Sequence, residues 1–151
     1  MKKIKGCGEM YNLDDCIGFI TNKGAKILSD EFNRRLQEHD MTRVQWIALY
    51  YIGKTNGIFQ KELSDNMSVK ESSMVRLIDR MEKDDLVERR KEIKDRRVTR
   101  IFLSDKGKKL REELIPLGEE FQRDAVNGIS EDELNIFKNV LEKMINNVCK
   151  Y

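Results

Sequence analysis

The side chains in this 151-residue chain that point most clearly to chemistry lie in one basic segment. The stretch ERRKEIKDRRVTRIFLS, from Glu88 to Ser104, carries seven lysine and arginine side chains and ends in an apolar run. Repulsion among charges this close costs stability, so internal counter-charges or an anionic partner must offset it. Guanidinium and ammonium groups bind phosphate oxygens and replace the counter-ions around a nucleic acid. The chemistry indicated is phosphate binding.

Charge is distributed unevenly along the sequence. The formal net charge is only +2, but from Arg89 to Arg111 eleven basic residues stand against three acidic ones, which gives +8. The rest of the chain therefore carries −6. A basic block on an acidic body is typical of a protein that binds a polyanion such as nucleic acid. Taken alone, the block is explained equally well as a solvated run of charges.

The sequence offers little support for catalysis or metal binding. It has one histidine, His39, no CxxC pair, no nucleophile motif and no glycine-rich phosphate loop. The three cysteines are far apart, and Asp14 and Asp15 beside Cys16 predict an unreactive thiol. We therefore expect no enzyme activity, no cofactor, no disulfide framework and no zinc site.

Length and composition predict one helical domain. An apolar content of 39% is enough for a core, and one proline and nine glycines favour long helices. No apolar run is as long as a membrane span, and MKKIKGCGEM lacks the apolar stretch of a signal peptide. These features predict a cytoplasmic protein with no membrane partner.

Helical spacing of apolar residues predicts the first two elements. From Leu13 to Gln37 apolar residues recur every three or four positions, which indicates an amphipathic helix. The sequence TRVQ, Thr42 to Gln45, is a capping box in which side chains satisfy the unpaired backbone donors of a helix start. The helix that follows, VQWIALYYIGK, is apolar nearly all round, so we expect it to be central and buried, with Trp46 in the core.

A pair of short helices is predicted next. After a very short strand at Ile58-Phe59, QKELSDNM forms a short helix with Leu63 and Met67 facing inward. The sequence SVKE, Ser68 to Glu71, reads as a second capping box that opens the helix VKESSMVRLIDRMEKDD. We expect Asp79 in this helix to support neighbouring basic residues by helical spacing. Two such helices are a helix-turn-helix candidate. The apolar stripe of the second helix is Met74, Leu77, Ile78 and Met81.

The segments LVERR and VTRIFL read as two short strands joined by KEIKDR. Ser104 caps a long helix, and SEDE, Ser130 to Glu133, is a capping box for the last, amphipathic helix.

The order of helix, helix-turn-helix and basic hairpin predicts a winged helix, mainly α with a small β-hairpin wing. Its second helix fits the major groove of DNA, and the hairpin can place an arginine in the minor groove.

From Gln60 to Leu110 the sequence resembles the DNA-binding core of MarR-type transcriptional regulators. Three pieces carry the resemblance: KEL, VRLIDRMEKDDLVERR, and the wing motif KDRRVTRIFLSDKG. The resemblance implies that Arg97 enters the minor groove, that Asp95 braces the wing tip by an ion pair, and that Arg76 belongs to the recognition helix. Two departures are Asp84-Asp85, where the family usually has a glycine, and Ser104 in place of threonine.

We expect a single MarR-like domain over residues 1–151, with a DNA-binding lobe over about 42–110 and dimerisation helices over about 10–38 and 111–150. The predicted function is a homodimeric regulator, with repression favoured, that binds a palindromic operator in double-stranded DNA. The resemblance implies a small-molecule effector, which no residue identifies. The alternative function is a winged-helix module for RNA binding or protein–protein interaction. Ser72 and Ser73 could contact bases, but they are equally well explained as small surface residues without a role in binding. The candidate DNA-binding residues are Lys70, Ser72, Ser73, Arg76, Arg80, Lys94, Asp95, Arg96 and Arg97.

Overall fold

Helices account for most of the computed structural model, which describes residues 12–55, 57–92 and 98–149. A three-stranded antiparallel sheet of order β1-β3-β2 completes the described part of the chain. The predicted fold class, mainly α with a small β wing, is confirmed. The elements in chain order are a 3-10 helix Leu13–Asp15, α1 Ile17–Gln37, α2 Arg43–Lys54, β1 Ile58–Phe59, α3 Gln60–Asn66, α4 Glu71–Lys83, β2 Val87–Lys91, β3 Thr99–Leu103, α5 Asp105–Ala125 and α6 Glu131–Val148.

The predicted hairpin is part of a slightly larger sheet. Strands β2 and β3 pair from Val87 opposite Leu103 to Lys91 opposite Thr99. The short strand β1 then pairs with the other edge of β3, with Ile58 opposite Ile101. The sheet therefore ties the connection after α2 to the wing, so the wing is anchored to the body of the lobe.

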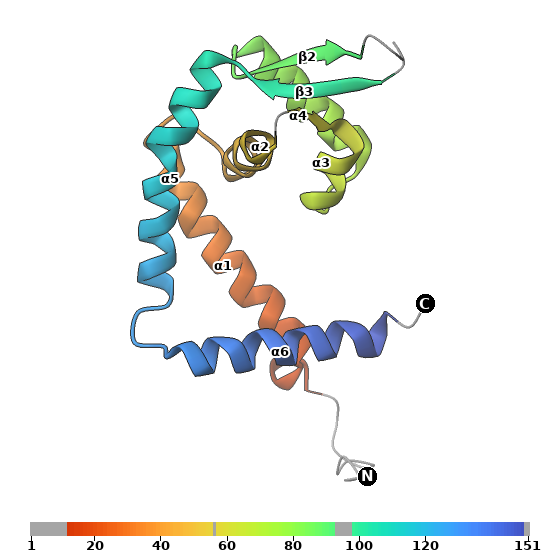
Figure 1. Ribbon diagram of the computed structural model, residues 1–151. Helices are drawn as coiled ribbons and strands as arrows, with labels where there is room; N and C mark the ends of the chain where they lie inside the picture. Colours follow the sequence, from red (N-terminus) through yellow and green to blue (C-terminus); the bar gives the residue numbers. More distant parts are fainter. Residues whose placement is uncertain (1–11, 56, 93–97, 150–151) are drawn as a thin grey trace.

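Helix α2 lies at the centre of the lobe, in contact with α1, α3, α5 and β3 (Figure 1). Its buried residues include Leu49 and Ile52, but Val44 and Tyr50 are each 39% exposed. The expected central position of this helix is confirmed, but its burial is incomplete, because its neighbours leave one side of it uncovered. Trp46 is partly buried against the core, and its Nε1 donates a 3.0 Å hydrogen bond to the Leu114 carbonyl of α5.

Three of the predicted helix caps are present. Thr42 and Gln45 form the capping box of α2, and Ser130 and Glu133 form that of α6. The Ser104 hydroxyl accepts a 2.9 Å hydrogen bond from Gly107 N at the start of α5. In each case the signal is contained within four consecutive residues, which explains why the sequence predicts it correctly.

The predicted capping box at Ser68 is wrong. Ser68 has a φ of 52° and ends α3 instead of opening α4, which begins at Glu71 with Lys70 as its N-cap. Its backbone N donates to the Asp65 carbonyl and Val69 N donates to the Ser64 carbonyl, each at 3.0 Å, which is the Schellman pattern of a helix C-terminus. A residue in this left-handed conformation cannot also serve as the extended N-cap of the next helix.

The same motif ends α4 at the position where the sequence lacks a glycine. Asp85 has a φ of 57°, its N donates to the Glu82 carbonyl at 3.0 Å, and Leu86 N donates to the Met81 carbonyl at 2.8 Å. The turn therefore has the geometry that glycine favours, with an aspartate in the left-handed position.

Helices α1, α5 and α6 extend away from the lobe (Figure 1). Helix α5 runs from the wing to the far end of the molecule, where α6 lies across the N-terminal half of α1. Helix α6 contains no buried residue, and α1 buries only Phe32 and Leu36 at its lobe end. In the described part of the chain, no helix is both long and apolar enough to cross a membrane.

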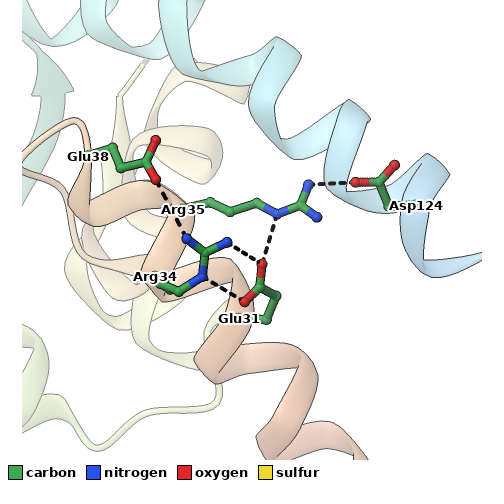
Figure 2. A network of polar contacts seen from close by, with 5 residues as sticks. All are labelled: Glu31, Arg34, Arg35, Glu38 and Asp124. Carbon is green, nitrogen blue, oxygen red and sulfur yellow. Dashed lines mark hydrogen bonds and ion pairs between the residues drawn. The ribbon is translucent and has the colours of Figure 1, made fainter.

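An ionic network joins α1 to α5 near the lobe (Figure 2). Glu31 accepts hydrogen bonds from Arg34 at 2.8 Å and from Arg35 Nε at 3.2 Å, and Arg35 Nη1 reaches Asp124 of α5 at 2.7 Å. Hydrogen bonds from Arg34 and then Arg35 lower the pKa of Glu31 from 4.5 to about 2. Ionised Glu31 orients Arg35 toward α5.

Replacing Asp85 by Gly should raise the free energy of unfolding by about 0.5–1 kcal/mol, because glycine adopts positive φ without a steric cost. Replacing it by Val should lower that free energy by about 1–2 kcal/mol, because a β-branched side chain is strained there. Urea denaturation of the three proteins measures both effects. Equal stability of the Gly and Val variants would contradict the left-handed assignment.

The contribution of Glu31 should depend on pH. Its folded-state pKa is depressed, so its stabilising effect is present above the unfolded value of about 4.5 and is lost as pH falls toward about 2. Thermal unfolding of the parent protein and of Glu31→Gln should therefore differ at neutral pH and converge over that acidic window. A difference that stays constant down to the acid limit would show that the Glu31 charge contributes nothing.

Candidate nucleic-acid interface

Helix α4 is divided into a buried and an exposed face. Met74, Ile78 and Met81 are fully buried and Leu77 is 3% exposed, as the spacing predicts. These four side chains are inserted between the other helices of the lobe and the sheet. Because the apolar stripe must face the core, the opposite side of α4 is directed toward solvent.

The five candidate residues near or on α4 all lie at the exposed side. Lys70 is the N-cap, Ser72 and Ser73 are in the first turn, and Arg76 and Arg80 follow at a spacing of four residues. None of their side chains makes a hydrogen bond or ion pair with any residue that the structure describes. Two unpaired guanidinium groups one turn apart can bind phosphates or guanine edges.

Arg89 of β2 connects the wing to α4. Its Nη2 lies 2.7 Å from Asp79 Oδ1 and its Nη1 lies 2.7 Å from Glu82 Oε2, while its backbone N donates to Glu82 at 3.1 Å. The expectation that Asp79 supports basic residues within its own helix is therefore wrong, because its partner comes from the adjacent strand. These contacts fix the direction of the wing relative to α4.

The other strand arginines are also paired internally. Arg100 of β3 forms a 2.6 Å ion pair with Glu92, donates to the Gly57 carbonyl at 3.1 Å, and stacks over Phe59 with its Cζ 4.0 Å from the ring centre. Arg90 of β2 pairs with Glu88. Part of the basic charge in this segment is therefore balanced by internal counter-charges, one of the two explanations that the sequence left open.

The remaining candidate residues lie outside the described part of the chain. They are Lys94, Asp95, Arg96 and Arg97, at the tip of the predicted wing.

No group of three or more potential metal ligands occurs among the residues that the structure describes.

Comparison with known proteins identifies the family of this arrangement. Residues 39–98 match the sequence model of the MarR family. The chain is 33% identical over 120 residues to YsmB, an uncharacterized HTH-type transcriptional regulator of Bacillus subtilis (strain 168), and the match covers 80% of this chain and 82% of YsmB.

Two solved structures share the fold over most of their length. One is the S. aureus MepR–DNA complex, with a TM-score of 0.82, 21% identity, and coverage of 88% of this chain and 98% of that chain. The other is a structure of BpsR from Bordetella bronchiseptica, a protein whose DNA binding is regulated by 6-hydroxynicotinic acid. Its TM-score is 0.82 at 18% identity, and the match covers 90% of this chain and 97% of that chain. At these identities the likeness establishes the fold.

A double-mutant cycle tests whether Arg89 braces the wing. Arg89→Gln and Glu82→Gln should each lower the free energy of unfolding, and the pair should show a coupling energy of about 0.5–1 kcal/mol, as expected for a partly exposed ion pair. The control cycle pairs Arg89→Gln with Glu71→Gln, an exposed position on the same helix, and should be additive. Additive effects in both cycles would exclude the brace.

Proposed function

As the chain belongs to the MarR family of transcriptional regulators, we propose that it is a homodimeric repressor that binds a palindromic operator in double-stranded DNA. The observation that carries this proposal is the exposed face of α4, where Arg76 and Arg80 have no ion pair or hydrogen bond with any described residue. Solvated guanidinium groups on a rigid helix bind phosphates and base edges without breaking an internal contact. Operator DNA also implies that the protein acts in the cytoplasm.

The DNA contacts divide into two groups in this proposal. Helix α4 enters the major groove, where Arg76 and Arg80 bind base edges or phosphates and Lys70, Ser72 and Ser73 bind near the start of the helix. The wing reaches the minor groove, a role that rests on the family resemblance. It is assigned to Lys94, Asp95, Arg96 and Arg97.

The terminal helices form the dimer interface in this proposal, and the winged-helix lobe covers about residues 42–110. Helix α6 exposes Phe137 by 59% and Ile145 by 50%, and α1 exposes Ile20 by 48%. An apolar groove of about 600 Å³ lies between the two helices. Exposed apolar area of this kind is stabilised by burial against a second copy, and a two-fold axis makes each copy supply the same surface.

Dimerisation gives the recognition helices their function. Two copies related by a two-fold axis present two α4 helices. When the distance between these helices matches the repeat of the major groove, they read half-sites about one DNA turn apart. Each added half-site contributes its own phosphate contacts, so a palindrome binds more tightly than a single half-site.

A second cavity supports regulation by a small-molecule effector. It has a volume of about 370 Å³, lies between α2 and α5, and is lined by Trp46, Tyr50 and Gly118 among others. Aromatic walls with a few polar groups suit a small aromatic ligand, a class that includes the 6-hydroxynicotinic acid named for BpsR. Binding there would change the packing of α5 against the lobe and release the operator.

Selection of duplex fragments from the source genome tests the function as a whole. The full chain should enrich fragments that contain an inverted repeat with half-sites about one helical turn apart. No enrichment of any repeat, or tighter binding of single-stranded RNA than of the enriched duplex in a competition assay, would contradict the proposal and favour an RNA or protein interaction module.

Replacing Arg76 by Gln should weaken operator binding by about 1–3 kcal/mol without changing the fold, because its exposed side chain makes no hydrogen bond or ion pair with any described residue. Arg123→Gln is the matched control, since it removes the same charge from an exposed position on α5. Fluorescence anisotropy with the selected operator measures both. Equal affinity of the Arg76→Gln variant and the parent would remove Arg76 from the interface.

Replacing Phe137 by Glu should convert the dimer to monomers, because it places a charge in the apolar surface of α6. Asn139→Glu is the control: it adds the same charge at an exposed position on the opposite, polar side of the helix. Sedimentation velocity at micromolar concentration distinguishes the two states. A dimeric Phe137→Glu protein, or a monomeric Asn139→Glu protein, would contradict the assignment of α6 to the interface.

A further inference from the structure

A basic cleft lies at the junction of α2, the wing strands and α5, and it shares no lining residue with the α2–α5 cavity. Its volume is about 520 Å³, within the range of pockets that hold small ligands. The cleft lies on the face of the β2–β3 sheet that carries Arg90 and Phe102, opposite the face that packs on α4. Its charged lining residues are Lys54, Arg90, Lys108, Arg111 and Glu112.

Arg111 of α5 is the central cation of this cleft. Its Nε is shielded from solvent and has no hydrogen-bond partner, and its guanidinium group makes no ion pair with any residue that the structure describes. Its Cζ lies 6.0 Å from the ring centre of Tyr50. A buried donor without a partner carries a desolvation cost, which a hydrogen-bonding ligand at the adjoining guanidinium nitrogens would offset.

The position of Arg111 depends on a glycine of α2. A Cβ atom at Gly53 would lie 2.4 Å from both Cδ and Nε of Arg111, so the side chain can cross the helix only where no side chain is present. The absence of a side chain at Gly53 of α2 therefore leaves room for Arg111 beside the cleft.

The cations around Arg111 are only partly neutralised. Lys54 forms no ion pair with any described residue, and Lys108 pairs at 2.9 Å with Asp105, whose side chain is 94% exposed. Arg90 pairs with Glu88 and stacks on Phe102, with its Cζ 4.5 Å from the ring centre. Glu112 is the one acidic side chain in the described lining. The cleft thus has an excess of positive charge that an anion would balance.

We propose that this cleft is a binding site for a small organic polyanion that carries carboxylate or phosphate groups. Lys54 and Arg111 bind the anionic groups, and Arg90 and Lys108 strengthen the attraction from the wing and from α5. A small molecule fits better than the DNA backbone, because Arg111 Nε is shielded from solvent within the cleft and the outward-facing arginines of α4 lie on a different surface. This inference concerns ligand binding and stands apart from the proposed repressor function.

Isothermal titration calorimetry of the full chain, without DNA, tests the site. The probes are citrate, glucose 6-phosphate and inorganic phosphate at constant ionic strength, with glucose as the uncharged control. Citrate or glucose 6-phosphate should bind saturably, more tightly than inorganic phosphate, and glucose should not bind. Tighter binding of citrate identifies carboxylates as the preferred groups, and tighter binding of glucose 6-phosphate identifies phosphate.

The variants locate the binding. Arg111→Gln should weaken the better probe by at least about tenfold, as expected for the loss of a charge-assisted hydrogen bond. Lys109→Gln is the matched control: it removes a charge two residues away on α5 from an exposed side chain outside the cleft, and it should bind almost normally. If circular dichroism shows that Arg111→Gln does not fold, Lys54→Gln takes its place in the titration. Because the Lys54 side chain is exposed, its replacement should not disturb folding.

Two results would overturn the proposal. The first is the absence of saturable binding of both citrate and glucose 6-phosphate to the parent protein. The second is equal weakening by the cleft variants and by Lys109→Gln, which would place the anions in a general surface field. If no probe binds and Arg111→Gln and Lys54→Gln both reduce affinity for duplexes of any sequence, the cleft is a contact for the DNA backbone instead.

Discussion

The packing of the apolar stripe of α4 is the constraint on which the rest of the structure depends. Burying Met74, Ile78 and Met81 contributes roughly 1.5–3 kcal/mol for each side chain, which is far more than any surface ion pair in the molecule. This packing fixes the rotation of α4 about its own axis. Arg76 and Arg80 then point outward whether or not DNA is present, so the energy that folds the lobe also orients its candidate recognition surface.

Positive charge has two roles in this chain, separated by position. Arg89 and Arg100 belong to the framework. Arg89 pairs with two carboxylates of α4, and Arg100 pairs with Glu92 and donates to the Gly57 carbonyl just before β1. Arg76 and Arg111 have no ionic partner among the described residues, and each lies on a surface or in a cleft that an anion can reach. A net charge of +2 conceals this separation.

Local signals in the sequence predicted most of the fold, and contacts between distant residues explain the errors. The capping boxes at Thr42 and Ser130 and the stripe of α4 depend on neighbours within one or two turns, so spacing alone reveals them. Ser68 matches the same capping pattern but ends the preceding helix, and nothing local decides between these two uses. The pairing of Asp79 with Arg89 depends on how β2 lies against α4, which helical spacing cannot supply. Of the candidate site, the exposure of the α4 residues followed from the stripe. The basic block from Arg89 to Arg111 indicated positive charge but not a cleft, because the position of Arg111 depends on Gly53 of a different helix.

The central claim is that the unpaired arginines of α4 bind DNA phosphates, and the salt dependence of DNA binding tests it most directly. The affinity of the full chain for its selected duplex should be measured across a series of sodium chloride concentrations. Each phosphate neutralised contributes a slope of about −0.9 to the plot of log association constant against log salt concentration, so a dimer that uses two α4 arginines per copy should give a slope of about −3.6 or steeper. An affinity that does not change with salt, or no binding to duplex DNA at low salt, would contradict the account.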